Sequence, residues 1–297
     1  MKDKKIRTGQ VVKGVGGNYK VSSDGDIIIC NGRGKLKLDG DIFIGDYVEF
    51  SDFGNGRGAI EKILPRKNKI TRPYITNIDM IVICIAPSPR PDFYLVDKLL
   101  INCIKQNITP VLCVNKTDLM DEDFKNNVQN SYQNLCDICY VNAISGNGID
   151  KLIKLMSGNY VSMAGQSAVG KSSIINSIVG KEMLQTGELS RKVERGKHTT
   201  RSVEIFDIGH NIRLADTCGF SVLEIENINP DELSTYFTDF DDFACNCKFN
   251  GCNHINEPEC AVKLAVKENK LSKDRYDRYV ALYTDLLEKW RKRYDWV

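Results

Sequence analysis

Long apolar runs are missing from this sequence of 297 residues. The longest, "MIVICIAP" from Met80 to Pro87, is far shorter than the roughly 20 residues that cross a bilayer. The basic start "MKDKKIRTGQ" has no apolar stretch after it, which argues against a secretory signal. We therefore expect a cytoplasmic protein with no membrane partner.

Internal repeats, low-complexity tracts and a strong net charge are also absent. The formal net charge is +2, with 42% hydrophobic and 27% charged residues, which is typical of a globular chain. A chain of this length is expected to form two or three domains.

The charge is unevenly distributed along the chain. Residues 1–72 hold 15 Lys and Arg against 9 Asp and Glu, and residues 263–297 hold 10 against 6. The middle, residues 73–262, holds 16 against 24. Two basic ends favour a polyanionic partner, although an ordinary solvated surface would give the same counts.

The pattern of short strands and turns changes twice along the chain. Short β-branched runs separated by Gly, Asp and Asn turns predict a small β-barrel over residues 1–70, with "LPRKNKITRP" as a linker. Over residues 71–230 strands alternate with helices, which predicts a mostly parallel α/β sheet. Residues 231–297 contain no clear strand; a Cys/His cluster is followed by one long charged helix expected from Pro258 onward.

The segment "GQSAVGKSS" fits the phosphate-loop pattern G-x-x-x-x-G-K-[ST] in full. It follows an apolar strand and opens an apolar helix, which makes a chance Gly-rich turn a poor alternative. Backbone N–H groups and Lys171 would hold the phosphates, and the Ser172 hydroxyl would ligate Mg²⁺. The predicted phosphate contacts are Gly165, Gln166, Ser167, Ala168, Val169, Gly170, Lys171, Ser172 and Ser173.

The tetrapeptide "NKTD", Asn115 to Asp118, follows another buried strand, where α/β sheets bind ligands. An Asn/Asp turn is the simpler reading, but a phosphate loop in the same chain favours a guanine-reading loop. The Asp118 carboxylate would accept from guanine N1–H and the 2-amino group, with Asn115 reaching N7, Lys116 packing along the base, and Thr117 completing the loop. In "VNAISGNG" the Ala143 N–H would face the guanine oxygen.

Two later segments have the character of nucleotide switches. "LADTCGF" contains Asp-x-x-Gly, so Asp216 would hold Mg²⁺ through water and the Gly219 N–H would meet the γ-phosphate. "RGKHTTR" lies between the phosphate loop and this sensor, and we expect Thr200 to ligate Mg²⁺. A polar surface loop is the alternative for that segment.

The water-positioning group is less evident. Phe220 occupies the position after Asp-x-x-Gly, where a Gln often orients the attacking water. His198 is the nearest candidate, with a phosphate-contacting role as the alternative. Some GTPases use a potassium ion held by an Asn of the phosphate loop. The corresponding residue here is Ala168, so the sequence does not support that route.

Four of the eleven cysteines crowd into sixteen residues. Cys247, Cys252, His254 and Cys260 give C-x4-C-x-H-x5-C, a set that suits one structural, four-coordinate Zn²⁺. Cys245 is left out because the other four complete the set. Buried free thiols are the alternative reading.

The order of these motifs is that of a GTPase whose starting point has been moved. "NKTD" before "GQSAVGKSS", then "RGKHTTR", "DTCGF" and the zinc set, resembles the RsgA (YjeQ) family of circularly permuted GTPases over essentially the whole chain. The departures are Asn142-Ala143-Ile144 in the second base loop and Cys218 where Pro is usual.

The resemblance implies an assembly factor that binds the small ribosomal subunit and its rRNA late in maturation, hydrolyses GTP to GDP there, and leaves afterwards. It implies an OB-like barrel for RNA, Mg²⁺ with GTP, a monomer, and hydrolysis stimulated by the subunit. Two alternatives remain: a GTP-binding, RNA-binding regulator with little turnover, and a P-loop kinase of a small molecule, against which "NKTD" argues.

Overall fold

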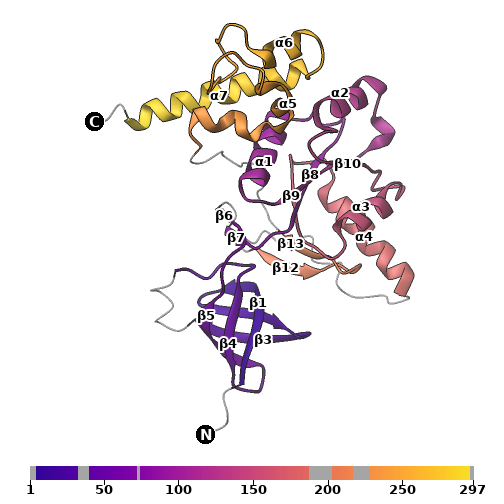
Figure 1. The fold of residues 1–297 in the computed structure, drawn as a ribbon. Helices are drawn as coiled ribbons and strands as arrows, with labels where there is room; N and C mark the ends of the chain where they lie inside the picture. Colours follow the sequence, from indigo (N-terminus) through magenta and orange to yellow (C-terminus); the bar gives the residue numbers. More distant parts are fainter. Residues whose placement is uncertain (1–4, 33–39, 72–73, 187–202, 217–227, 295–297) are drawn as a thin grey trace.

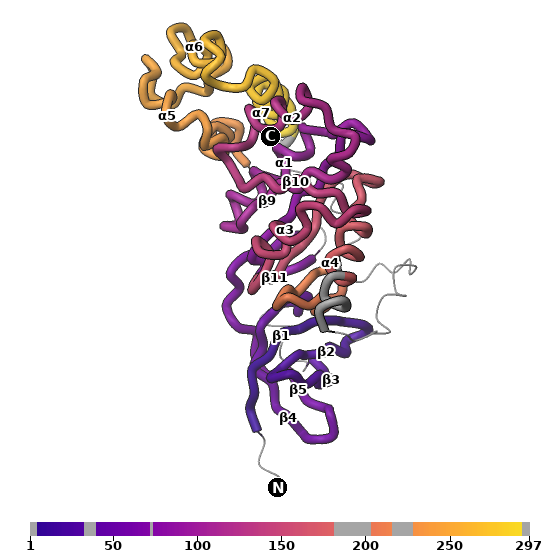
Figure 2. Tube along the Cα trace, turned by 90° about the vertical axis from the view of Figure 1, so that its right-hand side faces the viewer, coloured from indigo at the N-terminus to yellow at the C-terminus, as the bar shows by residue number. Residues whose placement is uncertain are grey.

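The computed structural model describes residues 5–32, 40–71, 74–186, 203–216 and 228–294. A barrel and a helical region lie at opposite ends of a central α/β sheet (Figures 1 and 2). Among the helices of these residues, none is long and apolar enough to cross a membrane.

The barrel confirms the prediction for the N-terminal region. Its five strands follow the order β1-β2-β3-β5-β4 and close through pairing of β1 with β4. Strand β1 changes partner at Gln10, which pairs with both Ser22 and Tyr47. Buried Val11, Val21, Phe50 and Ile60 are among the residues that fill the interior. The strands are β1 (Lys5–Val15), β2 (Asn18–Ser23), β3 (Asp26–Gly32), β4 (Tyr47–Asp52) and β5 (Arg57–Ile63).

The expected linker is partly ordered as a ribbon. Strand β6 (Lys69–Thr71) pairs antiparallel with β7 (Tyr74–Thr76), between the barrel and the central sheet (Figure 1). Buried Ile70 and Ile75 anchor this ribbon to the core of the sheet.

The central sheet has the strand order β10-β9-β8-β11-β13-β12. All neighbours pair parallel except β12 with β13, so the predicted α/β class is confirmed. The six residues of β8 are all buried, as expected for a strand covered on both faces. The strands are β8 (Met80–Ile85), β9 (Thr109–Val114), β10 (Asp137–Tyr140), β11 (Tyr160–Ala164), β12 (Glu204–Asp207) and β13 (Arg213–Asp216).

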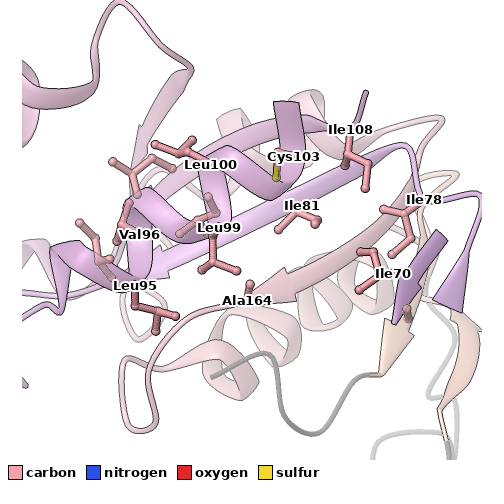
Figure 3. Close-up of a cluster of buried hydrophobic side chains, with 14 of the residues drawn as sticks. Ile70, Ile78, Ile81, Leu95, Val96, Leu99, Leu100, Cys103, Ile108 and Ala164 are labelled. Carbon is pink, nitrogen blue, oxygen red and sulfur yellow. The ribbon is translucent and has the colours of Figure 1, made fainter. Parts of the chain in front are cut away.

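Separate apolar clusters cover the two faces of this sheet. Helices α1 (Phe93–Lys105) and α2 (Glu122–Tyr132) contribute to one cluster, part of which Figure 3 shows. Helices α3 (Ile149–Met156) and α4 (Lys171–Thr186) belong to the other. The predicted nucleotide loops emerge at the carboxyl ends of the parallel strands.

Strand β12 joins the barrel to the central sheet. Lys13 of β1 pairs with Glu204 across an antiparallel bridge, and their side chains form an ion pair of 2.6 Å. Arg213 of β13 also donates to Gln10 Oε1 over 2.7 Å. The barrel and the central sheet are therefore hydrogen-bonded into one continuous sheet.

The C-terminal region differs from the prediction in one respect. The prediction of a single helix from Pro258 is wrong, because α6 (Ala261–Lys267) and α7 (Lys273–Tyr294) are separate helices. The chain turns at Asn269, whose φ of 56° is one that Asn tolerates better than most residues, and Ser272 Oγ caps the start of α7 by accepting from the Arg275 N–H. Ahead of them lie η4 (Pro230–Tyr236), η5 (Thr238–Phe240) and α5 (Asp241–Ala244).

A buried ionic cluster holds α7 against α1. Asp97 of α1 is fully buried and accepts from Arg275 over 2.6 Å and from Arg278 over 2.5 Å. The Tyr132 hydroxyl donates to the same carboxylate, and Arg275 also pairs with Asp239 over 2.8 Å. Because Asp97 accepts from three groups and each arginine has two partners, burial of the cluster is compensated.

Candidate functional site

The phosphate loop begins where β11 ends. Gly165 has a φ of +129°, and an added Cβ would lie 2.2 Å from the Cys84 carbonyl oxygen of the neighbouring strand. Only glycine therefore fits this close approach. Six residues later the chain enters α4 at Lys171, which leaves the Ser172 and Ser173 side chains exposed at the helix start.

The Lys171 ammonium is held at the beginning of the phosphate loop. Its Nζ donates to the carbonyl oxygens of Gly165 over 2.7 Å and Gln166 over 2.6 Å. Burial lowers the pKa of this lysine below its usual value. A partly desolvated ammonium held by two neutral carbonyls has no carboxylate partner among the described residues, so it can still gain an anionic one.

The base loop is built onto the phosphate loop. Asn115, only 2% exposed, donates from Nδ2 to the Val169 carbonyl oxygen over 2.9 Å. Its Oδ1 accepts from the Ala143 N–H over 3.1 Å. Asn115 therefore bridges the phosphate loop and both base loops, and its contact with guanine N7 stays a prediction.

Lys116 gives the base loop a second link. Its φ of 57° is left-handed, and its Nζ donates to the carbonyl oxygens of Ala168 over 2.9 Å and Ser88 over 2.7 Å. The aliphatic stem of the lysine consequently spans the gap between the base and phosphate loops.

The second base loop is organised by Asn142. Its Nδ2 donates to Asp118 Oδ1 over 2.7 Å, while its Oδ1 accepts from the backbone N–H groups of Ile144 and Ser145 over 2.9 and 3.0 Å. One amide thus shapes the turn and fixes the Asp118 carboxylate. The Ile144 side chain is 93% exposed at the rim.

Sequence reasoning missed the segment after β8. Ser88 supplies the carbonyl that receives Lys116, and the Asp92 N–H donates to Gln166 Oε1 of the phosphate loop over 2.9 Å. The available signal was the Pro-rich turn "PSPRPD" directly after a buried strand, at the ligand-binding edge of a parallel sheet.

Several predicted site residues fall outside the described part of the chain. His198, Thr200 and Gly219 are among them, and of Asp216 the structure describes the backbone at the end of β13. Their roles in the switches and in hydrolysis stay predictions.

The four predicted zinc ligands do come together. Their ligand atoms all lie within 4.8 Å of one another. His254 Nδ1 is 3.6 Å from Cys247 Sγ and 3.4 Å from Cys260 Sγ, and the two sulfurs are 3.9 Å apart. A tetrahedron with metal–sulfur distances of about 2.3 Å has edges of about 3.8 Å, so the donor set and its spacing are compatible with Zn²⁺. Cys245 is exposed and is not part of the group.

Helix α7 supports the backbone of this cluster. The Tyr276 hydroxyl donates to the His254 carbonyl oxygen over 2.7 Å, and the Tyr279 hydroxyl to that of Asn253 over 2.6 Å. The Glu257 carboxylate accepts from the N–H groups of Asn253 and Ile255 over 2.7 and 2.9 Å. Burial alone would raise the pKa of Glu257, but these N–H donors outweigh it and lower the pKa.

A phosphate loop that follows an Asn-Lys-x-Asp loop in the chain, yet touches it on one parallel sheet, defines a circularly permuted P-loop GTPase. Comparison of the chain with models of known protein families identifies its family. The model of the RsgA GTPase domain matches residues 63–226 and that of the RsgA N-terminal domain matches residues 8–60. The chain therefore belongs to the RsgA GTPase family.

Relatives match over nearly their whole length. The small ribosomal subunit biogenesis GTPase RsgA of Caldanaerobacter subterraneus is 39% identical over 289 residues, which cover 96% of this chain and 98% of the relative. That of Clostridium kluyveri is 39% identical over 285 residues, covering 95% and 98%.

Two solved structures match this chain over nearly its whole length. YjeQ from Thermotoga maritima matches with a TM-score of 0.82 and 34% identity, covering 95% of this chain and 99% of that one. YloQ, a circularly permuted GTPase, matches with a TM-score of 0.79 and 29% identity, covering 96% of each chain.

Proposed function

We propose that this chain is a GTP-hydrolysing assembly factor that binds the small ribosomal subunit late in its maturation and leaves after hydrolysis. The observation that supports this most is the convergence of three loops through Asn115, which joins Val169 and Ala143. The relatives named small ribosomal subunit biogenesis GTPases match over 98% of their length, which supports the same partner here.

The phosphate loop would take the polyphosphate. Lys171 would exchange its two carbonyl acceptors for phosphate oxygens, an anionic partner that compensates its burial better than neutral groups do. Backbone N–H groups from Gly165 to Ser173 would complete the cradle. Mg²⁺ would be held by the Ser172 hydroxyl together with Thr200 and, through water, Asp216, and would neutralise charge on the phosphates.

The base loops would select guanine. The Asp118 carboxylate, oriented by Asn142, would accept from N1–H and the 2-amino group, which adenine does not offer. Lys116 would lie along the base, with Thr117 in the same loop, and the Ala143 N–H would turn from Asn115 towards the guanine oxygen. Gly219 would contact the γ-phosphate and report its loss.

Zinc is proposed as a structural ion at Cys247, Cys252, His254 and Cys260. Four protein ligands leave no position open for a substrate. The ion would supply folding energy to a segment that has a small core of its own.

Each of the three regions would have its own function. We assign RNA binding to the barrel of residues 1–70, nucleotide turnover to residues 71–230 and subunit docking to residues 231–297. The basic ends would neutralise rRNA phosphates, giving salt-dependent affinity for the subunit. GTP would tighten that affinity relative to GDP through the segment joining the sensor to the zinc site, and a single copy would act.

The test is GTP turnover with and without small subunits, by wild type and His198→Ala. Stimulation in the wild type and its loss in the variant are expected if His198 positions the water. His210→Ala is the matched control because its turn joins β12 and β13 at the opposite edge of the sheet. Stimulation that survives in His198→Ala would remove His198 from the mechanism.

The same assay separates the alternative of a regulator with little turnover. Tight GTP binding with no subunit stimulation of the wild type would favour that regulator. Equal affinity of the GTP-bound and GDP-bound protein for the subunit would contradict the nucleotide switch.

A further inference from the structure

We propose that Phe43, Tyr74 and Lys69 form a platform on which one unpaired nucleobase of single-stranded RNA stacks, at the junction of barrel and GTPase sheet. The proposal rests on the proposed function and deepens it by naming a specific RNA contact. Of these residues Lys69 lies in the basic linker, Phe43 precedes β4 and Tyr74 begins β7, and neither the nucleotide site nor the zinc site uses them.

The two rings are brought together by backbone pairing. Ile44, just before β4, forms a parallel bridge with Ile75 of β7, and the Thr76 N–H donates to the Ile44 carbonyl oxygen over 3.0 Å. The preceding residues, Phe43 and Tyr74, therefore project side by side. Their ring centroids are 5.2 Å apart and their planes differ by 18°, so the rings are stacked.

One end of this stack is closed by cations. The Arg66 guanidinium carbon lies 4.6 Å, and Lys69 Nζ 4.5 Å, from the centroid of the Phe43 ring. The other ring, Tyr74, is 57% exposed. A planar group added to Tyr74 would extend the column, and every nucleobase has a face that can do so.

The two cations differ in what they can still bind. Arg66 is held by the fully buried Asp46, with Nε and Nη2 at 2.7 and 2.8 Å from its carboxylate oxygens, and Thr76 donates to the same carboxylate. Arg66 is therefore a fixed support for Phe43. Lys69 is exposed and has no carboxylate partner among the described residues, whereas the nearby Lys67 is paired with Asp79. Lys69 is thus the residue free to meet an RNA phosphate beside the stacked base.

A purely structural role is the competing explanation, because the same stack ties the ribbon β6–β7 to the barrel. The two roles make different predictions. A structural tie gains stability from the area that both rings bury, whereas a platform needs one rigid ring open to solvent, as Tyr74 is. Removing a structural tie lowers the melting temperature, and removing a platform weakens RNA binding.

The experiment measures binding of a fluorescein-labelled ten-nucleotide oligoadenylate and of a matched RNA duplex to the full chain. We expect Tyr74→Ala to weaken binding of the single strand roughly 5- to 150-fold, with little change for the duplex or the melting temperature. Tyr74→Phe should retain affinity because it keeps the ring. Lys69→Ala should reduce the slope of log affinity against log salt by about 0.7.

Phe53→Ala is the matched control, since Phe53 is an exposed aromatic, 47% accessible, in the turn between β4 and β5. Equal single-strand affinity of Tyr74→Ala and wild type would overturn the platform, and a lowered melting temperature alone would leave only the structural tie. Equal oligoadenylate affinity with weaker subunit binding would mean that a protein segment occupies the site instead.

Subunit-stimulated GTP turnover separates this proposal from the proposed function. Stimulation of the wild type that Tyr74→Ala keeps in full, together with unchanged RNA affinity, removes the platform and leaves the assembly factor standing. A wild type that neither binds nor responds to subunits removes the proposed function itself.

Discussion

Asn142 and Asp118, from two different loops, are joined by a hydrogen bond of 2.7 Å from amide to carboxylate. The bond fixes one carboxylate oxygen of the base loop. The side-chain oxygen of the same Asn142 organises its own turn. Asn142, one of the departures in the second base loop, therefore has a defined structural role.

The first prediction concerns that bond. Asn142→Ala should weaken binding of GDP about fivefold or more, because a typical hydrogen bond contributes about 1 kcal/mol and the turn also loses its acceptor. Titration with a fluorescent guanine nucleotide measures this. Asn142→Asp keeps the turn acceptor but sets a second carboxylate against Asp118, so it should weaken binding further. If both variants bind as the wild type does, Asn142 does not orient Asp118.

The second prediction concerns the contact between phosphate and base loops. Gly170 has a φ of +96°, and a Cβ there would lie 2.3 Å from Asn115 Nδ2. Gly170→Ala should therefore displace Asn115 and weaken both GDP and GTP at least tenfold. Gly180→Ala is the matched control, because Gly180 is helical with open space around it. Alanine there should leave affinity unchanged and stabilise the helix by about 1 kcal/mol. A Gly170→Ala protein with wild-type affinity would show that the loops move independently.

The third prediction concerns the ionic cluster between α1 and α7. Arg275→Met should lower the free energy of unfolding by about 3–5 kcal/mol, because it leaves Asp97 and Asp239 with fewer partners in a buried site. Urea denaturation measures the change. Lys273→Met, two residues before Arg275, removes an exposed ion pair with Asp277 one helical turn along α7 and should change stability by less than about 1 kcal/mol. Similar effects of the two variants would show that burial does not decide the cost.

The fourth prediction concerns zinc. Cys252→Ser should reduce bound zinc from one equivalent to near zero and expose residues 228–294 to proteolysis. Elemental analysis and limited digestion measure both effects. Cys245→Ser should change neither, because Cys245 is exposed and outside the four-residue group. Loss of metal in Cys245→Ser would show that the site uses a different ligand set.

The fifth prediction concerns thiol reactivity. Burial raises the pKa of Cys30 to about 11, so at pH 8 only about a thousandth of this thiol is thiolate, the reactive form. Iodoacetamide should therefore label exposed Cys245 in the native protein well before Cys30, and labelling of Cys30 should rise as pH rises towards 11. Peptide mass mapping measures both rates. Equal native rates would mean that the barrel opens readily.

Much of this site could be predicted because its motifs are local. A phosphate loop needs glycines and a lysine at fixed spacing, and four metal ligands within fourteen residues leave few alternatives. The alternation of strand and helix likewise predicted the parallel sheet.

The remainder depends on contacts between distant segments. Asn115 reaches Val169, and Ser88 receives Lys116, through pairing of strands that no local pattern specifies. The break between α6 and α7 was not predicted because Asn269 and Lys270 interrupt the apolar spacing only briefly. The packing of α7 against Asp97 joins residues far apart in the chain, which no local pattern specifies.

The bridge between Lys13 and Glu204 covers part of one edge of the central sheet. Strand β12 would be the outermost strand of the central sheet, with unpaired N–H and C=O groups facing outward. The barrel occupies part of that edge, so it shields a surface on which strands of a second copy could otherwise add. A version of the protein shortened to the nucleotide and zinc regions would lose this cover and would tend to aggregate even though its catalytic loops were intact.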